Sequence, residues 1–436
     1  MLPQTSNFFN SFSLLELAFN NKFIINHSYK IDPLDFVMSF FDMMNQDCFT
    51  WDGWAKRFFI STNTLCSANG LTAKFGFRYI FFFKALLKKA LVYSQTQLSN
   101  PPPIAFKFNH IWVTDSTCLS MPESLHGIFP GANNQFGSYS TARIQLTMDL
   151  LTDQIHKLDI CSFRNNDQSY SSDVLGYVKK GDLVIRDLGY FAIDVFKALE
   201  KKEAKFISKL RYGMVIRDNQ GLRMNLLKKL KLAFNSGVSH VDWHILMSNK
   251  KIPVRLIAVK CDSKVASQKV RKAENDRQPK VNHGPEYMEM QGYHILITNI
   301  EKDEIDLKDI WELYRLRWRI EVVFKCWKSK LNLEKLFKNK TMKNYSVPYC
   351  MLYLALTKIV ICHNSMFVPL RNKIRNKKGI PNLSMLKYYD IMANEFHLIS
   401  GRSSHFISKF LAAFSIYKRD INRKTHLEML YMLNSS

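Results

Sequence analysis

The sequence has no closely spaced pair of cysteines. Its eight cysteines are scattered along the chain, and none stands in a C-x-x-C pair. Structural zinc sites and disulfide frameworks depend on recurring spacings, so we expect neither in this chain. Scattered, unpaired cysteines suit a reducing cytoplasm. The eight are Cys48, Cys66, Cys118, Cys161, Cys261, Cys326, Cys350 and Cys362.

Signals for export or membrane insertion are missing too. The first residues, MLPQTSNFFNSF, lack the basic region and the cleavage site of a signal peptide. The most apolar run, residues 347–362, is too short to span a bilayer comfortably and contains Lys358, so we predict a buried helix there. We therefore expect a cytoplasmic protein without a membrane partner.

Acidic residues are scarce beside basic ones. The 436 residues include 37 Asp and Glu against 62 Lys and Arg, a formal net charge of +25. This excess favours a polyanionic partner, because neutralising phosphates releases their counterions. Ribosomal proteins, membrane-surface proteins and other nucleic-acid binders share such a charge, so it says nothing about catalysis. With 47% hydrophobic residues, the chain can bury a sizeable core in two to four domains.

Both ends of the chain are expected to be helical. Residues 1–100 predict a helical, DNA-binding region that ends at the Asn-Pro-Pro-Pro run. Within it, residues 50–71 have the pattern of two helices around a short turn, the second capped by Ser61 or Thr62. Two interpretations are open here: a helix-turn-helix that binds DNA, or an ordinary helical hairpin. Residues 341–436 predict a basic helical region that serves dimerisation or DNA contacts.

Residues 101–211 have the pattern of an RNase H-like core. Short apolar or alternating runs predict strands, and Thr152-Asp153 predicts the tip of a hairpin. The expected order is three strands, a helix, a strand, a helix and a strand, which is the order of an RNase H-like fold. The predicted strands are 111–114, 143–148, 155–160, 183–185 and 205–210, and the predicted helices are 171–178 and 193–199.

Residues 212–300 predict an inserted β-rich subdomain. Strand-like runs lie at 240–247, 254–259 and 293–298, and residues 263–284 between the last two are polar and basic, as in a linker. A long helix, about 307–331, then completes the core within residues 301–340. The expected fold class is mixed α/β: an RNase H-like core with an inserted β-rich subdomain, flanked by N-terminal and C-terminal helical regions.

Three carboxylates stand where such a core would use them. Asp115 and Asp187 each end a predicted short apolar strand, and Glu321 lies midway along the long helix. Three carboxylates that converge on one point repel one another, so they need cations to stay ionised together. Oxygen-only ligands suit Mg²⁺ or Mn²⁺, and two such ions about 4 Å apart can hold both oxygens of an in-line phosphoryl transfer.

The long helix carries a polar stripe around Glu321. Tyr314, Arg317, Glu321 and Lys328 fall within roughly 60° of arc on a continuous helix. A phenol, a guanidinium and an ammonium beside a carboxylate can bind phosphate. The other interpretation is a solvated face, on which an Arg317–Glu321 pair contributes only about 0.3–0.5 kcal/mol.

The segment YRLRWRIEVVFKCWK resembles the Y-x2-R-x3-E-x6-K signature of the insertion-sequence-4 family of bacterial DDE transposases, and all four positions match. The segment VTDST around Asp115 and the segment IRDLGYF around Asp187 are similar to the family's two Asp motifs. LITN, before the long helix, is also similar. The resemblance covers about residues 104–335.

This resemblance implies a catalytic triad of Asp115, Asp187 and Glu321 that holds two Mg²⁺ ions, with Mn²⁺ able to substitute. It also implies that three other side chains of the signature hold DNA phosphates, namely Tyr314, Arg317 and Lys328. The expected activity is cut-and-paste transposition: nicking of double-stranded DNA at the terminal inverted repeats, then strand transfer into target DNA by the freed 3′-hydroxyl. A homodimer in a bacterial, nucleoid-associated setting is implied as well.

One position departs from the family pattern. Relatives often carry a Trp shortly before the Thr-Asn pair, and here those positions are Tyr293 and His294, which are candidates for stacking on a base. Two alternatives to transposition stay open at this point. One is an RNase H-like nuclease without strand transfer, and the other is a catalytically silent derivative that only binds DNA.

Overall fold

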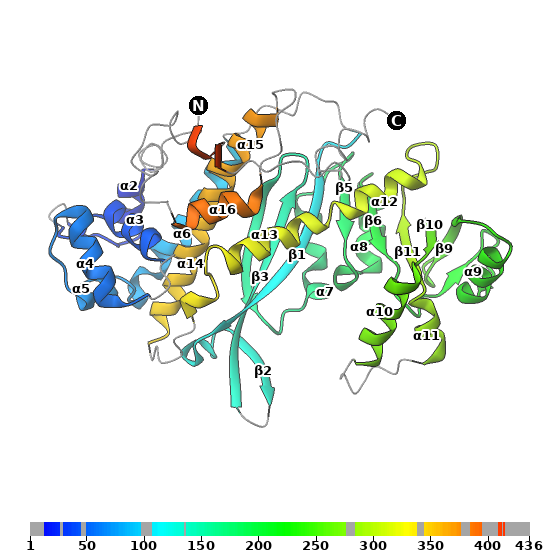
Figure 1. Ribbon diagram of the computed structural model, residues 1–436, viewed down its shortest axis with the longest axis horizontal. Helices are drawn as coiled ribbons and strands as arrows, with labels where there is room; N and C mark the ends of the chain where they lie inside the picture. Colours follow the sequence, from blue (N-terminus) through cyan, green and yellow to red (C-terminus); the bar gives the residue numbers. More distant parts are fainter. Residues whose placement is uncertain are drawn as a thin grey trace. The chain divides into compact units, whose positions relative to one another are not determined.

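Figure 1 shows the computed structural model of the chain, which divides into two compact units. The first unit comprises Met1–Pro103, Asp115–Asn165 and Trp318–His426, and the second comprises Ile104–Thr114, Asn166–Arg317 and Leu427–Ser436. The fold is mixed α/β, as predicted. The structure describes residues 13–26, 29–44, 49–96, 107–134, 137–275, 284–337, 344–375, 384–394, 409–411 and 413–414, so the predicted break at 100–103 lies outside the described residues.

The N-terminal helices of the first unit enclose an aromatic core. Phe36 packs edge to face on Trp54 and on Phe75, with ring centroids 5.2 and 5.4 Å apart. Ser61 and Thr62 end a helix rather than cap the next one, which corrects the predicted cap. The cap of the following helix is Ser67, whose hydroxyl accepts from the Gly70 amide at 3.1 Å. The helices are α2 (Leu14–Asn20), α3 (Pro33–Met43), α4 (Trp51–Thr62), α5 (Ala68–Ala73), η1 (Phe77–Tyr79) and α6 (Ile80–Thr96).

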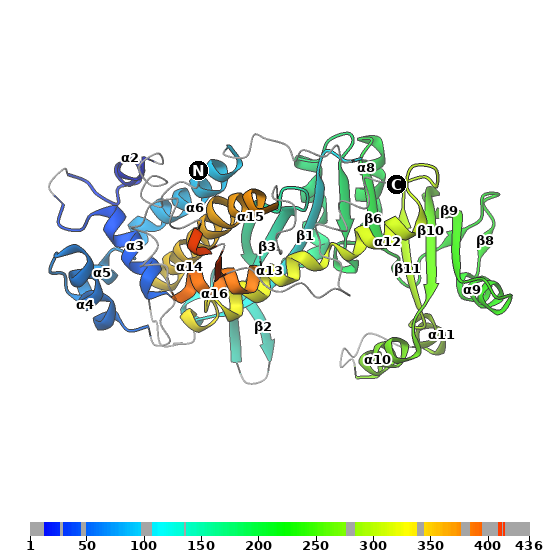
Figure 2. The same ribbon diagram turned by 45° about the horizontal axis from the view of Figure 1, so that its top comes forward.

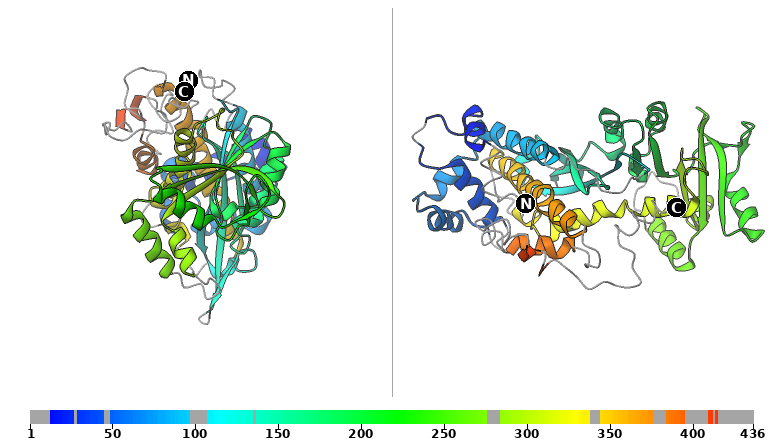
Figure 3. Two further views of the ribbon diagram at one scale, coloured as in Figure 1. Left: turned by 90° about the vertical axis from the view of Figure 1, so that its right-hand side faces the viewer. Right: turned by 90° about the horizontal axis from the view of Figure 1, so that it is seen from above.

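A long buried helical run forms the C-terminal part of the first unit. Figure 3 shows α14 (orange) beside α6 (light blue), and the two helices pack together. The run Ser346–Asn372 is long and apolar enough to cross a membrane, but 94% of its most apolar window is buried within the protein. The buried helix predicted over residues 347–362 is therefore confirmed, and the helical run extends beyond it to Asn372. Its elements are α14 (Ser346–Val360), a π-helical turn η6 (Ile361–Phe367) and α15 (Val368–Arg375), followed by α16 (Met385–Asn394).

The strands of the first unit include a hairpin whose tip lies at Thr152-Asp153, as predicted. Strand β1 contributes to both units and is longer than expected: it runs on past Asp115, because Thr117, Leu119 and Met121 continue its alternating burial. Asp115 therefore lies within the strand and not at its end, which corrects the prediction. The elements are β1 (Ile111–Met121), η2 (Glu123–Leu125), β2 (Pro130–Asn134), β3 (Gly137–Asp149) and β4 (Gln154–Ser162).

The second unit begins with parallel strands. The first residues of β1 pair with β5, and β5 pairs with β6, both in parallel. With β3 beside β1, and β4 antiparallel to β3, the strand order in the sheet is β4-β3-β1-β5-β6, and it agrees with the RNase H-like fold that we predicted from the order of elements along the chain. The predicted helix over 171–178 is a 3₁₀ helix over Ser171–Gly176, preceded by one α-helical turn at Asp167–Tyr170, which corrects the prediction. The elements are α7 (Asp167–Tyr170), η3 (Ser171–Gly176), β5 (Leu183–Arg186), η4 (Leu188–Tyr190), α8 (Ile193–Lys201) and β6 (Lys205–Lys209).

The predicted insertion, residues 212–300, extends this sheet beyond β6. Strands β11, β10 and β9 add to it in antiparallel order, and β7 and β8 complete that edge. Residues 263–274 are a helix, α10, capped by Asp262, and not a linker (Figure 2). The elements are β7 (Ile216–Arg217), β8 (Arg223–Met224), α9 (Leu226–Asn235), β9 (His240–Met247), β10 (Ile252–Lys260), α10 (Ser263–Glu274), α11 (Pro285–Met290) and β11 (Tyr293–Thr298).

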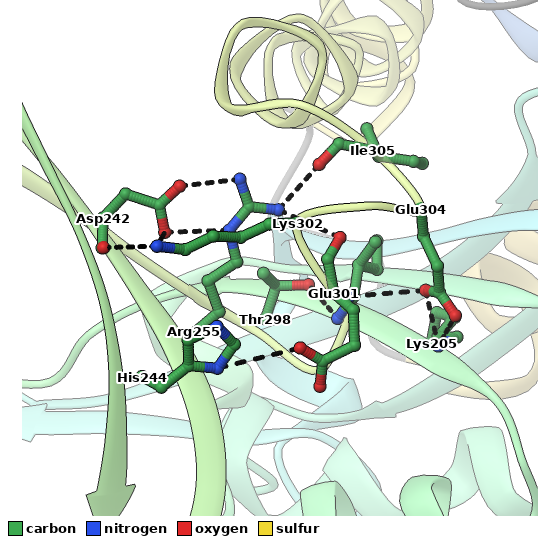
Figure 4. Close-up of polar contacts among 10 residues, drawn as sticks. Lys205, Asp242, His244, Arg255, Thr298, Glu301, Lys302, Glu304 and Ile305 are labelled. Atoms are coloured by element: carbon green, nitrogen blue, oxygen red, sulfur yellow. Dashed lines mark hydrogen bonds and ion pairs between the residues drawn. The ribbon is translucent and has the colours of Figure 1, made fainter. Parts of the chain in front are cut away.

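A buried arginine holds the loop between β11 and the next helix (Figure 4). Arg255 is 2% exposed and makes a two-pronged ion pair with Asp242, with both N–O distances 2.9 Å. Its remaining nitrogen donates to the carbonyls of Ile305, at 2.7 Å, and Glu301, at 3.3 Å. The loop that leads into α12 is therefore fixed against β9 and β10, which places α12 in the second unit.

The predicted helix 307–331 is two helices. The Leu316 amide bonds the carbonyls of Glu312 and Leu313, and the Arg317 amide bonds Tyr314 at 3.1 Å, so the turn tightens and α12 ends. Leu316 is buried at this point, which the sequence spacing alone did not show. The elements are α12 (Leu307–Arg315), in the second unit, then α13 (Trp318–Ser329) and η5 (Lys335–Phe337), in the first.

Candidate active site

Asp187 directly follows β5 and begins the turn η4, as the sequence predicted. Its Oδ1 accepts from the Tyr314 hydroxyl at 3.3 Å and lies 3.5 Å from the ammonium nitrogen of Lys209. Burial alone would raise the pKa of this carboxyl, but the charges of Arg317 and Lys209 and the Leu188 amide lower it below its ordinary value. The second unit thus keeps Asp187 ionised.

Tyr314 and Arg317 are both buried beside that carboxylate, with 8% and 9% of their surfaces exposed. Burial and the Asp187 charge raise the pKa of the Tyr314 phenol, so this side chain stays protonated and donates its hydrogen bond. A solvated face does not bury a tyrosine and an arginine around a carboxylate. For these two residues, the structure favours a built polar site over the alternative of a solvated face.

Lys209, at the end of β6, is a residue that the sequence analysis missed. It lies beside Asp187 and over the Tyr314 ring, 5.9 Å from its centroid. A signal for it did exist. Strands β5 and β6 are parallel with Arg186 opposite Ser208, so the next residue of each strand brings Lys209 to Asp187. The predicted order of elements already included both strands, but only the register between β5 and β6 shows that Lys209 lies beside Asp187.

Asp115 lies on β1 in the first unit and is half-buried. Its Oδ1 accepts from the Ser116 amide at 2.8 Å, and the Ser116 hydroxyl accepts from the Arg143 guanidinium at 2.9 Å. Arg143 comes from β3, the neighbouring strand, and sequence analysis did not single it out. An arginine from β3 therefore bonds Ser116, the residue next to Asp115 in the chain.

Glu321 and Lys328 lie on α13, in the first unit. The Lys328 ammonium donates to the Cys118 carbonyl of β1 at 3.1 Å and pairs with Glu334 at 2.9 Å. The helix that carries Glu321 therefore contacts the strand that carries Asp115. The predicted single stripe is wrong, because Tyr314 is on α12, Arg317 is in the turn, and only the other two share α13.

Tyr293 and His294 are the first residues of β11. The Tyr293 ring packs on Phe234, with centroids 5.4 Å apart, and the Lys269 ammonium lies 3.3 Å from Nδ1 of His294. Burial, Lys269 and Lys209 lower the pKa of His294 to about 4, so its imidazole is neutral near pH 7. Base stacking by these rings stays a prediction.

The donor set suits a hard divalent cation. Asp115, Asp187 and Glu321 offer only carboxylate oxygens, the ligands that Mg²⁺ and Mn²⁺ prefer, and the lowered pKa of Asp187 keeps one of them ionised. Asp115 and Glu321 belong to the first unit and Asp187 to the second. Within the described ranges, no three His, Cys, Asp or Glu side chains are grouped as a metal site, and none of the seven described cysteines forms a disulfide.

The strand order β4-β3-β1-β5-β6 is that of an RNase H-like core, and sequence comparison identifies the family. Residues 108–345, more than half of the chain, match the family described as the transposase DDE domain. The chain belongs to this family, so it is a DDE transposase, an enzyme that cleaves DNA and transfers strands. The predicted family resemblance is thereby confirmed, and divalent metal ions and DNA are the general cofactor and substrate of the family.

The relatives are transposases of bacterial insertion sequences. The transposase for insertion sequence element IS231F of Bacillus thuringiensis subsp. israelensis is 25% identical over 395 residues, covering 85% of this chain and 80% of the relative. The transposase for IS1151 of Clostridium perfringens is 26% identical over 390 residues, covering 83% and 81%. A piggyBac transposase synaptic complex with hairpin DNA matches with a TM-score of 0.41 and 10% identity, over 97% of this chain and 85% of that one.

Proposed function

We propose that this transposase moves an insertion sequence by cut and paste, with Asp115, Asp187 and Glu321 as its catalytic triad. The supporting observation is the environment of Asp187, a carboxylate kept ionised among Tyr314, Arg317 and Lys209. The pairing of β1 with β5 adds to it, because Val113 lies opposite Ile185 and each catalytic Asp stands two residues further along its chain.

The three carboxylates would hold two Mg²⁺ ions, with Mn²⁺ able to substitute. Such ions supply positive charge at the reacting phosphate and make a water molecule a stronger nucleophile. The basic side chains bind the DNA. The planar guanidinium of Arg317 binds a phosphate through two nitrogens, and the Tyr314 phenol donates a hydrogen bond. The ammonium groups of Lys328 and Lys209 add positive charge. Tyr293 and His294 are proposed to stack on a base at the transposon end.

The reaction consists of repeated in-line attacks on phosphorus. In the first, a water oxygen bonds to the phosphorus at the transposon end, and the departing 3′ oxygen takes a proton to become a hydroxyl. The oxygen of that 3′-hydroxyl then bonds to the phosphorus of a second phosphodiester, either on the opposite strand, which forms a hairpin, or in target DNA, and the 3′ oxygen that it displaces there takes a proton. One site serves each step, because each step needs the same alignment of a nucleophile, a phosphate and a leaving oxygen.

The partners follow from this chemistry. The substrates are the terminal inverted repeats and the target, both double-stranded DNA, and a homodimer would bring two ends together. Residues 1–100 are proposed to bind DNA, residues 101–211 and 301–340 to form the catalytic core around the insertion 212–300, and residues 341–436 to serve dimerisation or DNA contacts. We place the protein in the cytoplasm of a bacterium, at the nucleoid.

The test of this function is strand transfer by the purified full-length protein. Transposon ends that already carry a free 3′-hydroxyl, supplied with Mg²⁺ and a target plasmid, should become joined to the target. Joined products support transposition by cut and paste. Cleavage of uncut ends with no joining of pre-cut ends would contradict it, and would leave a nuclease that does not transfer strands.

Loss of a phosphate-binding side chain should slow cleavage without unfolding the protein. Arg317→Ala, Lys328→Ala and Lys209→Ala each remove a charge-assisted contact of about 1.5–3 kcal/mol, so cleavage of a bound end should fall at least about tenfold. Arg317→Lys should recover only part of the rate, because a point charge replaces the fork. The matched control is Lys205→Ala on the same strand as Lys209, since Lys205 pairs with Glu304 at 2.7 Å. Equal rates in Lys205→Ala and Lys209→Ala would contradict the role of Lys209.

DNA affinity should fall steeply as salt rises. The logarithm of the binding constant should drop by about 0.9 per phosphate neutralised for each tenfold rise in salt. Lys56 and Arg57, exposed on α4, should account for two of these phosphates, so their double replacement by Ala should reduce the slope by about 1.8. Lys180→Ala is the control, because Lys180 already pairs with Glu203 in the second unit. An unchanged slope in the double variant would remove α4 from the DNA interface.

A further inference from the structure

The tip of the β3–β4 hairpin carries a fully buried aspartate. Asp153 is 0% exposed and has a left-handed backbone conformation, with φ at 65°. Its carboxylate accepts from Nε of Arg319 at 3.1 Å and from Nη2 of the same side chain at 2.6 Å, and also pairs with Arg371. The Asp153 carboxylate thus binds one arginine from α13 and one from α15. A buried ion pair of this kind stabilises only when its geometry and hydrogen bonds are complete.

The π-helical turn η6 also bonds the β3–β4 hairpin. His363 and Asn364 are consecutive, and both reach the hairpin. Nε2 of His363 lies 2.8 Å from the Asp153 carbonyl oxygen, and Nδ1 lies 2.8 Å from the Tyr389 hydroxyl. Asn364 accepts from the Ile155 amide and donates to the Ile155 carbonyl, both at 2.8 Å. Two consecutive side chains of η6 thus bond the backbone of the hairpin at Asp153 and Ile155. The hairpin tip is therefore fixed in both position and orientation.

Helix α13 is not a continuation of α12, so its rotation about its own axis is not inherited from α12. It begins at Trp318, after the tightened turn that ends α12, and Arg319 is its second residue. At about 100° per residue, Arg319 and Glu321 point about 200° apart, on opposite sides of the helix. The bond from Arg319 to Asp153 therefore acts together with the buried apolar face of α13 to set the rotation of the helix about its axis, and with it the direction in which Glu321 points.

We propose that Arg319 is a positioning residue for Glu321, which it aims by its two-pronged bond to Asp153. This inference rests on the proposed function, since it takes Glu321 as the catalytic glutamate. Catalytic groups must be held within about 0.5 Å and 10–20° of the productive geometry. A guanidinium bound through two nitrogens resists rotation of the helix, whereas a lysine ammonium keeps the charge but makes a single, freely rotating contact.

The test is Arg319→Lys in the full-length protein, assayed by single-turnover cleavage of a bound transposon end at saturating DNA. We expect the rate to fall at least about tenfold, while the affinity for the end stays within about twofold of the parent protein. The Mg²⁺ concentration at half-maximal rate should rise, because a misdirected Glu321 is a poorer ligand. The matched control is Lys330→Met, in the turn just after the other end of α13, where the partly exposed pair with Asp390 is lost. This control should cleave at the parent rate.

A purely structural role predicts a different pattern. Arg371 bonds the same carboxylate but lies on α15, so Arg371→Lys should lower the melting temperature with a smaller loss of rate than Arg319→Lys. Asp153→Glu, which keeps the charge and moves it, should resemble Arg319→Lys. Equal losses of rate in the Arg319 and Arg371 variants, or a loss matched by the unfolded fraction, would overturn the proposal.

If Glu321→Gln cleaves normally, the proposed function itself fails. If only Glu321→Gln is inactive and Arg319→Lys is normal, the positioning role alone fails.

Discussion

Replacing any one of the three carboxylates by its amide should abolish cleavage of a transposon end. Asp115→Asn, Asp187→Asn and Glu321→Gln each remove one anionic ligand, so a cation is lost or displaced from the reacting phosphate. Electrostatic groups of this kind contribute at least about a hundredfold to rate, and we expect losses of this size or larger. Binding of the end should stay within a few-fold of normal, because the basic side chains that hold the phosphates are unchanged.

The measurement is cleavage of a labelled end with Mg²⁺, beside a binding assay on the same variant. Asp194→Asn is the matched control, since Asp194 lies on α8 of the second unit, largely exposed, in a surface pair with Lys250. Near-normal cleavage by any one of the three amide variants would remove that residue from the triad. A variant that loses binding together with cleavage would assign its carboxylate a different role.

Asp153→Asn should strongly destabilise the first unit. The amide has almost the same shape, but it leaves Arg319 and Arg371 buried without their counter-charge. Breaking a buried ion pair by removing one partner costs about 3–5 kcal/mol, far more than loss of an exposed pair, which costs under about 1 kcal/mol. The free energy of unfolding, measured by urea titration with a probe in the first unit, should fall by that amount.

Asp390→Asn is the control for this change, because Asp390 also pairs with a cation of the same unit, Lys330 at 2.7 Å, but half of its side chain is exposed. We expect that variant to unfold at nearly the parent urea concentration. A loss of stability in Asp153→Asn no larger than in the control would mean that the buried cluster contributes no net stability. A triple variant in which Asp153, Arg319 and Arg371 are all replaced by apolar residues should recover part of the loss.

Local pattern predicted most of the elements around the site. Strands β9 and β11 begin and end at the predicted residues, because their apolar alternation is bounded by polar residues on both sides. The hairpin tip at Thr152-Asp153 was also predictable, since a short polar pair separates two alternating runs. The errors occur where tertiary packing overrides local pattern. The spacing of residues 307–331 is continuously helical, yet burial of Leu316 and the bonds at Arg317 divide it into α12 and α13.

The sequence by itself determined the class of protein and the identity of its candidate acids. A short motif, Y-x2-R-x3-E-x6-K, and two Asp motifs are each contained in a few consecutive residues, so their resemblance to the family could be recognised without coordinates. Only the tertiary structure decided which side chains surround those acids. Lys209 comes to Asp187 through the register of two parallel strands, and Arg319 comes to Asp153 across 166 residues of chain. Such neighbours depend on long-range packing and strand register, which no local spacing encodes.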